Sequence, residues 1–212
     1  MVLIISCGLI CHVHAQTSGR NNIAAAPAAG KLIEIDNIQI LLPDIKVLNH
    51  EGKLVHFYSD LVKDKVVLLS FFYTSCRYVC LRQGESLSKV QEQLGARLGK
   101  DVFLISISMD PQTDTPQKLK SWGKAFGARP GWTLVSSKAP EIERLLKALT
   151  GNDPGQKEMH SSLVFLGNDR TGAWLTTDGL LDPGSLVKLL EGLMNKDDAE
   201  RRPVKSVKIL SR

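Results

Sequence analysis

The spacing of apolar residues changes several times between the period of a strand and the period of a helix after residue 41 of this chain. Two short runs, residues 45–48 and 54–58, flank a polar connection and predict a β-hairpin. The continuous apolar run at residues 66–73 predicts a buried strand. Apolar residues then recur at three- or four-residue spacing from Leu87 to Leu98, and they predict a helix that ends at Gly99.

The rest of the chain continues this alternation, with proline at helix starts and glycine after helix ends. The pattern predicts, in order, a strand at residues 102–108, a helix from Pro116 to Gly127, a strand at 132–135, a helix from Pro140 to Gly151, a hairpin of strands 161–166 and 173–176, and a helix from Pro183. This order predicts an α/β protein of the thioredoxin-like plan, with an added N-terminal β-hairpin and an inserted helix.

The N-terminal part of the chain differs from this domain in composition. Residues 1–15 are interpreted as a signal peptide, because a short apolar run ends in Val13-His14-Ala15, a small-residue cleavage site. Residues 16–40 are expected to form a flexible tether, residues 41–195 the thioredoxin-like domain, and residues 196–212 a basic tail. Export would place the domain on the periplasmic side of a bacterial membrane, either soluble or membrane-tethered.

The stretch Ile4-Ile5-Ser6-Cys7 also resembles a bacterial lipobox. Acylation of Cys7 is therefore an alternative to cleavage after Ala15, and it would add a membrane surface to the partners of the protein.

Composition narrows the class of protein further. The chain has 212 residues, of which 43% are hydrophobic and 23% charged, so it can build a core without disulfide cross-links. The net charge of +5 comes from basic residues that are scattered except near the C-terminus. This distribution argues against a nucleic-acid-binding surface.

Cys76 and Cys80 lie where the predicted strand 66–73 gives way to a helix. If the helix begins near Cys76, the four-residue spacing puts both sulfurs on one face, close to an N-terminus whose dipole and free N–H groups stabilise a thiolate. Thiolates bind soft metals and attack disulfides. The pair is therefore expected to be a metal site or a redox-active dithiol, rather than two cysteines that only fill space in the core.

His160 directly precedes the predicted strand 161–166, and in a thioredoxin-like sheet the loop before this strand reaches the same edge as the thiols. Its imidazole is therefore a candidate third ligand beside Cys76 and Cys80. Two thiolates and one imidazole suit Cu(I), whereas Cu(II) would need an additional ligand. A structural zinc site closes with four protein ligands, and because no fourth is evident, copper is favoured over zinc.

Two aspartates follow the predicted strand 102–108. Asp110 comes at its carboxyl end and is a candidate hydrogen-bond acceptor for a metal ligand. Asp114, in Asp114-Thr115-Pro116, is expected to belong to a turn and helix cap rather than to the chemistry of the site.

Three segments together resemble the SCO1/SenC family of copper-binding, thioredoxin-like proteins. Residues 72–80 are similar to the family's F-T-x-C-P-x-V-C-P site, residues 108–116 to its S-x-D-P-x-x-D-T-P segment, and Met159-His160-Ser161 to its D-H-S segment. Arg77 and Leu81 stand where the family has prolines, and neither change removes a ligand.

The resemblance implies a chaperone that holds copper, as Cu(I) or Cu(II), with Cys76, Cys80 and His160. It would deliver copper to, or help assemble, the binuclear copper centre of cytochrome c oxidase. Its partners would be an oxidase subunit or another copper protein, together with a thioredoxin-like reductant. The residues leave one alternative open, a thiol-disulfide oxidoreductase in which Cys76 attacks and Cys80 resolves without a dedicated metal.

Overall fold

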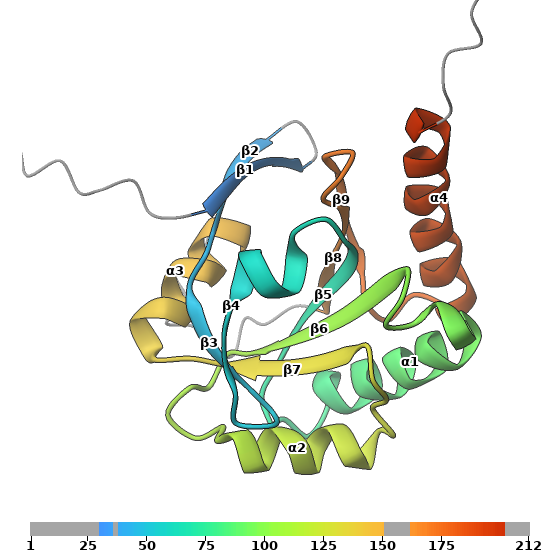
Figure 1. Cartoon of the computed structure of the whole chain (residues 1–212). Coiled ribbons are helices and arrows are strands. Elements are labelled where there is room, and N and C mark those ends of the chain that lie inside the picture. Colours follow the sequence, from blue (N-terminus) through green and yellow to red (C-terminus); the bar gives the residue numbers. More distant parts are fainter. Residues whose placement is uncertain (1–29, 36–37, 151–161, 202–212) are drawn as a thin grey trace, which may run out of the picture.

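The computed structural model describes residues 30–35, 38–150 and 162–201 (Figure 1). The strands are β1 (Gly30–Ile35), β2 (Ile38–Pro43), β3 (Lys46–Asn49), β4 (Leu54–His56), β5 (Val66–Phe72), β6 (Val102–Ser108), β7 (Trp132–Ser136), β8 (Leu163–Asn168) and β9 (Ala173–Asp178). The helices are α1 (Val79–Leu94), α2 (Pro116–Ala125), α3 (Ala139–Thr150) and α4 (Pro183–Arg201), with a π-helical turn at Phe57–Val62 and a 3-10 turn at Gly95–Arg97.

These strands form one sheet in the order β2-β1-β9-β8-β5-β6-β7-β3-β4. The central strand β5 pairs with β6 in parallel on one side and with β8 in antiparallel orientation on the other, and elements packed on both faces bury it along its whole length. A strand covered on both faces is apolar throughout, which explains the continuous hydrophobic run of its sequence. The carboxyl ends of β5 and β6 and the start of β8 therefore meet at one edge of the sheet.

Helices cover both faces of this sheet (Figure 1). Because side chains of a strand alternate between faces, Leu68 of β5 packs in the core under α1, α2 and α4, whereas its neighbour Leu69 packs under α3 and the π-helical turn. The predicted α/β class and the predicted order of strands and helices after residue 41 are confirmed, and the π-helical turn was not predicted.

The prediction of a flexible tether is wrong for its last part. Residues 30–35 and 38–43 form the antiparallel hairpin β1–β2, and β1 also pairs in parallel with β9. Ile33 and Leu42 of this hairpin are buried in the core on the α3 face, and this burial stabilises the two strands. The Ala- and Gly-rich sequence before them is typical of a linker, which is why the pattern predicted a tether here. Residues 1–29, which include the predicted signal peptide and Cys7, lie outside the described residues.

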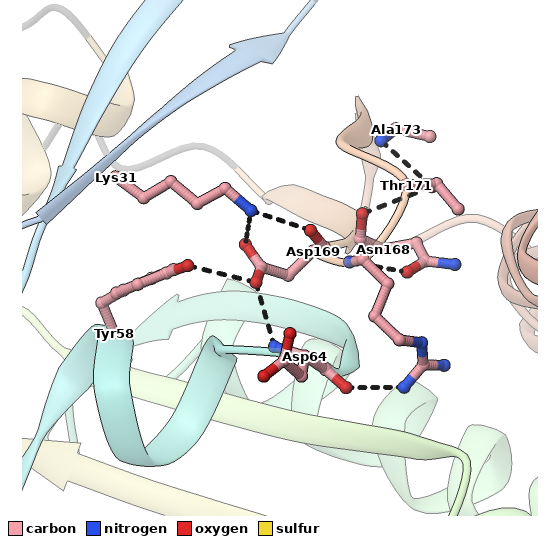
Figure 2. Close-up of polar contacts among 8 residues, drawn as sticks. Lys31, Tyr58, Asp64, Asn168, Asp169, Thr171 and Ala173 are labelled. Atoms are coloured by element: carbon pink, nitrogen blue, oxygen red, sulfur yellow. Dashed lines mark hydrogen bonds and ion pairs between the residues drawn. The ribbon is translucent and has the colours of Figure 1, made fainter.

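Asp169 anchors the β1–β2 hairpin to the rest of the domain (Figure 2). Its buried carboxylate accepts hydrogen bonds from Lys31 Nζ (3.1 Å), the Tyr58 hydroxyl (3.2 Å) and the Asp64 backbone N–H (2.9 Å). Lys31 also donates to the Asp169 backbone carbonyl at 2.9 Å. One side chain thus ties β1, the π-helical turn and the turn between β8 and β9 together.

Two helix ends differ from the predictions. The helix α1 ends at Leu94 and not at Gly99, because Gly95 (φ 56°) takes a left-handed conformation that stops it. The last helix continues to Arg201, so residues 196–201 of the predicted basic tail are helical. Across the described part of the chain, no helix combines the length and the hydropathy needed to cross a bilayer.

Candidate metal centre

The two thiols lie at the junction between β5 and α1. Cys76 belongs to the loop after β5, where its N–H donates to the carbonyl of Tyr73 (3.1 Å), and Cys80 lies in the first turn of α1. The expected start of the helix near Cys76 is corrected by three residues, since α1 begins at Val79. Both cysteines are in the thiol form, and both are buried, with exposed fractions of 8% for Cys76 and 0% for Cys80.

Hydrogen bonds around the pair favour a thiolate on Cys76. Burial alone would raise the pKa of Cys76, but hydrogen bonds from the backbone N–H groups of Tyr78 and Cys80, from the Cys80 thiol and from the Tyr73 side chain outweigh it, so this pKa lies below its ordinary value. Burial and the hydrogen bond to Cys76 raise the pKa of Cys80 to about 12. The first negative charge of the pair therefore resides on Cys76.

The carboxylate of Asp114 accepts hydrogen bonds from the loop that carries Cys76, a role that the sequence did not indicate. Thr74 donates both its backbone N–H (3.0 Å) and its hydroxyl (2.5 Å) to the Asp114 carboxylate, and Ser108 donates its hydroxyl to it (2.6 Å). The expected cap at the start of α2 exists, but Thr115 makes it by accepting from the N–H of Lys118 (3.4 Å). Asp114 itself is 2% exposed and belongs to the thiol site.

Asp110 is buried beside the same loop. Its backbone N–H donates to the Ser108 hydroxyl at 3.1 Å, and its carbonyl accepts from the N–H groups of Thr113 and Asp114. These contacts shape the turn that delivers Asp114. The assignment of the Asp110 side chain as a hydrogen-bond acceptor for a metal ligand stays a prediction.

His160, the predicted third ligand, lies outside the described residues. The nearest described residue on its C-terminal side is Ser162, whose carbonyl accepts from Gln83 Nε2 (3.1 Å) and from the N–H of Gly179 (2.7 Å). Gln83 is on α1, close after Cys80. Among residues 30–35, 38–150 and 162–201, no three His, Cys, Asp or Glu side chains are grouped so that they could hold a metal ion.

The rim of the thiol site is exposed, although the sulfurs are not. Tyr78, two positions before Cys80, is 82% exposed, and Leu81, directly after Cys80, is 40% exposed. Arg77, between the two thiols, is also exposed and takes part in no ion pair with another described residue.

Comparison with known proteins identifies the family of this domain. The model of the SCO1/SenC family matches residues 39–195. A SCO2-like protein of Rickettsia conorii is 28% identical over 157 residues, which cover 70% of this chain and 74% of that protein.

Solved structures of Sco proteins share the fold of this chain. BsSco, a member of the Sco family of cytochrome c oxidase assembly proteins in which a disulfide switch was identified, is 22% identical with a TM-score of 0.61, and the match covers 79% of this chain and 97% of that chain. Bradyrhizobium japonicum ScoI with copper bound is 23% identical with a TM-score of 0.57, covering 78% of this chain and 99% of that chain. The predicted thioredoxin-like fold is confirmed, and the chain belongs to the SCO1/SenC family.

Proposed function

We propose that this protein is a copper chaperone that holds a Cu(I) ion with Cys76, Cys80 and His160 and passes it to a copper site of cytochrome c oxidase. The observation that carries the proposal is the pair of buried, hydrogen-bonded thiols at the β5–α1 junction of a SCO1/SenC domain. The copper bound to the related ScoI of Bradyrhizobium japonicum supports the same choice of metal.

The chemistry of the donors fits Cu(I) as the cargo. Thiolate sulfur is a soft ligand, and Cu(I) accepts few ligands of this kind. Cys76 is already poised as a thiolate, whereas Cys80, whose pKa is raised to about 12, must lose its proton when it binds the metal. Copper binding by both sulfurs therefore releases a proton and weakens as the pH falls.

The sheet register supports His160 as the third ligand. The strand β8 runs antiparallel to β5 with Ser70 opposite Val164, so the chain just before β8 approaches the carboxyl end of β5. The hydrogen bond from Gln83 to Ser162 then holds this segment against α1 (3.1 Å). His160 lies two positions before Ser162 in the sequence, and we infer that its imidazole joins the two thiols as the third ligand.

A dithiol oxidoreductase is the second candidate function. The observation that favours it is the difference between the two thiols, since the pKa of Cys76 is lowered and that of Cys80 is raised. A thiolate on Cys76 attacks a partner disulfide, and Cys80 then resolves the mixed disulfide, so that the partner leaves as a dithiol and Cys76 and Cys80 become a disulfide. Two electrons pass to the partner, with one proton from Cys80 and one from water. The same pair would have to be reduced, by a thioredoxin-like protein, before it could hold copper.

The site of action follows from the sequence of the N-terminus. Export by the predicted signal peptide, or anchoring through Cys7, would place the domain outside the bacterial inner membrane, on the side where the oxidase exposes its binuclear copper centre. The exposed rim of Arg77, Tyr78 and Leu81 would then be the surface that meets the oxidase subunit or another copper protein.

Replacement of His160 separates the two functions. The reduced His160→Ala variant should lose copper affinity in an anaerobic Cu(I) titration against a competing chelator, and it should reduce a model disulfide within about a few-fold of the wild-type rate. His56→Ala, on the edge strand β4, is the matched control and should leave both measurements unchanged. Equal copper affinity in His160→Ala and wild type would favour the oxidoreductase.

A further inference from the structure

Asp114 is a buried carboxylate that the capping of α2 does not explain. A charged group in the core requires hydrogen bonds to compensate for lost water, and Asp114 obtains three, two from Thr74 and one from Ser108. All three groups donate to the oxygens of the Asp114 carboxylate. The cap at the start of α2 is made by Thr115 instead.

These bonds converge on the turn that carries Cys76. Thr74 lies two residues before Cys76, and the N–H of Cys76 donates to the carbonyl of Tyr73, so residues 73–76 form one turn. The Asp114 carboxylate fixes this turn at both the backbone and the side chain of Thr74. Ser108, which donates to Asp114 and accepts from the N–H of Asp110, joins the same carboxylate to the end of β6.

We propose that Asp114 is the positioning residue of the thiol site, because its contacts with Thr74 and Ser108 fix the turn that sets Cys76 relative to Cys80 and to the first turn of α1. The role deepens the proposed function, since both copper binding and disulfide formation need the two sulfurs close together. It is nevertheless a property of the metal-free, reduced protein. It can be measured whether or not the domain carries copper.

The disulfide equilibrium of the metal-free protein reports this role. In exchange with oxidised glutathione, the protein dithiol becomes the Cys76–Cys80 disulfide, and one oxidised glutathione becomes two reduced molecules. The equilibrium constant measures how well the fold brings the sulfurs together, and global stability by itself does not enter it while the protein stays folded.

Three variants and one control test the proposal. Asp114→Ala, which removes the acceptor of all three hydrogen bonds, should lower the equilibrium constant by about tenfold or more. Thr74→Val, which removes only the hydroxyl donor, should lower it by about three- to tenfold, and Thr74→Ser, which restores that donor, should return it to within about twofold of wild type. Ser70→Ala is the control. The hydroxyl of Ser70 on β5 makes a buried hydrogen bond with the hydroxyl of Ser106 on β6 (2.8 Å), and not with Asp114.

The outcomes decide between positioning and simple stabilisation. The proposal requires that Ser70→Ala lower the melting temperature without changing the disulfide equilibrium, and that Thr74→Val change the equilibrium while remaining folded by circular dichroism. If Asp114→Ala does not fold, the pair Thr74→Val and Thr74→Ser still supplies the test. Wild-type equilibrium constants in folded Asp114→Ala or Thr74→Val would overturn it, and a wild-type protein without copper affinity would overturn only the proposed function.

Discussion

Gln83 and Ser162 join two segments of the site that are far apart in the sequence: Nε2 of Gln83 donates to the Ser162 carbonyl at 3.1 Å. The glutamine is 2% exposed and lies on α1, in the turn that follows Cys80. Ser162 lies one position before β8. The helix that carries one thiol therefore also holds Ser162, two positions after His160 in the sequence.

Gln83→Ala should lower the affinity for Cu(I) by about three- to tenfold, because the loss of a buried hydrogen bond frees the segment next to the proposed third ligand. Disulfide formation between Cys76 and Cys80 should change little. The measurement is an anaerobic chelator competition on the reduced protein.

Gln91→Ala is the matched control for this variant. Gln91 is also on α1 and 2% exposed, but its amide bonds the carbonyl of Gly127 (2.8 Å) and the N–H of Arg129 (3.1 Å), away from β8. This variant should lose about 1–2 kcal/mol of stability and keep its copper affinity. Equal copper affinity in all three proteins would show that the Gln83 contact does not matter for the metal.

Alkylation of the reduced protein should distinguish the two thiols by pH. The thiolate is the reactive form, and the lowered pKa of Cys76 keeps this cysteine reactive at pH values below the ordinary cysteine value of about 8.5. Cys80, buried and with its pKa raised to about 12, should react only at strongly alkaline pH. Iodoacetamide labelling followed by peptide mass spectrometry at several pH values measures both rates, and parallel rates for the two cysteines would contradict the assignment of the charge to Cys76.

Asp169→Asn should destabilise the domain by about 1–3 kcal/mol, because the carboxylate loses its charge while Lys31 and Tyr58 still face it. Lys31→Ala should cost only about 0–1 kcal/mol, since the Lys31 side chain is 39% exposed and water replaces the lost partner. Urea unfolding measures both values. An equal effect of the two variants would mean that the β1–β2 hairpin depends on the ion pair alone.

Two glycines in helices should respond in opposite directions to alanine. A Cβ on Gly84 of α1 would lie 2.8 Å from the ring of Phe126, so Gly84→Ala should cost about 1–3 kcal/mol by overpacking the contact between α1 and α2. A Cβ on Gly192 of α4 would meet no atom within 4 Å, so Gly192→Ala should gain about 0.5–1 kcal/mol from helix propensity. Thermal unfolding of both variants measures the difference, and stabilisation by both would show that Phe126 moves aside without cost.

The sequence allowed the domain to be predicted wherever one local pattern decides the structure. The run at residues 66–73 and the prolines at 116 and 183 mark β5, α2 and α4, and the two thiols at a strand-to-helix junction identify the site. The predicted tether, residues 16–40, includes residues 30–35 of β1, because the pairing of β1 with β9 and the burial of Ile33 depend on residues more than a hundred positions away.

The role of Asp114 at the site could not be predicted either, because it too depends on a residue distant in the sequence. Asp-Thr-Pro has a sufficient local explanation as a helix start, so its sequence gives no reason to look for a second role. Only the turn from β6 through Asp110 brings the carboxylate to Thr74, 40 positions earlier in the chain. The role of a buried polar side chain depends on partners that the fold brings to it, and these have no periodic signature in the sequence.

The central claim, copper held by the two thiols and the His160 imidazole, is tested most directly by X-ray absorption spectroscopy of the Cu(I)-loaded protein. The expected spectrum contains two sulfur donors and one nitrogen donor in the wild-type protein, two sulfur donors without that nitrogen in His160→Ala, and at most one sulfur donor in Cys76→Ala. A wild-type spectrum with only nitrogen and oxygen donors, or an unchanged two-sulfur spectrum in Cys76→Ala, would contradict the account.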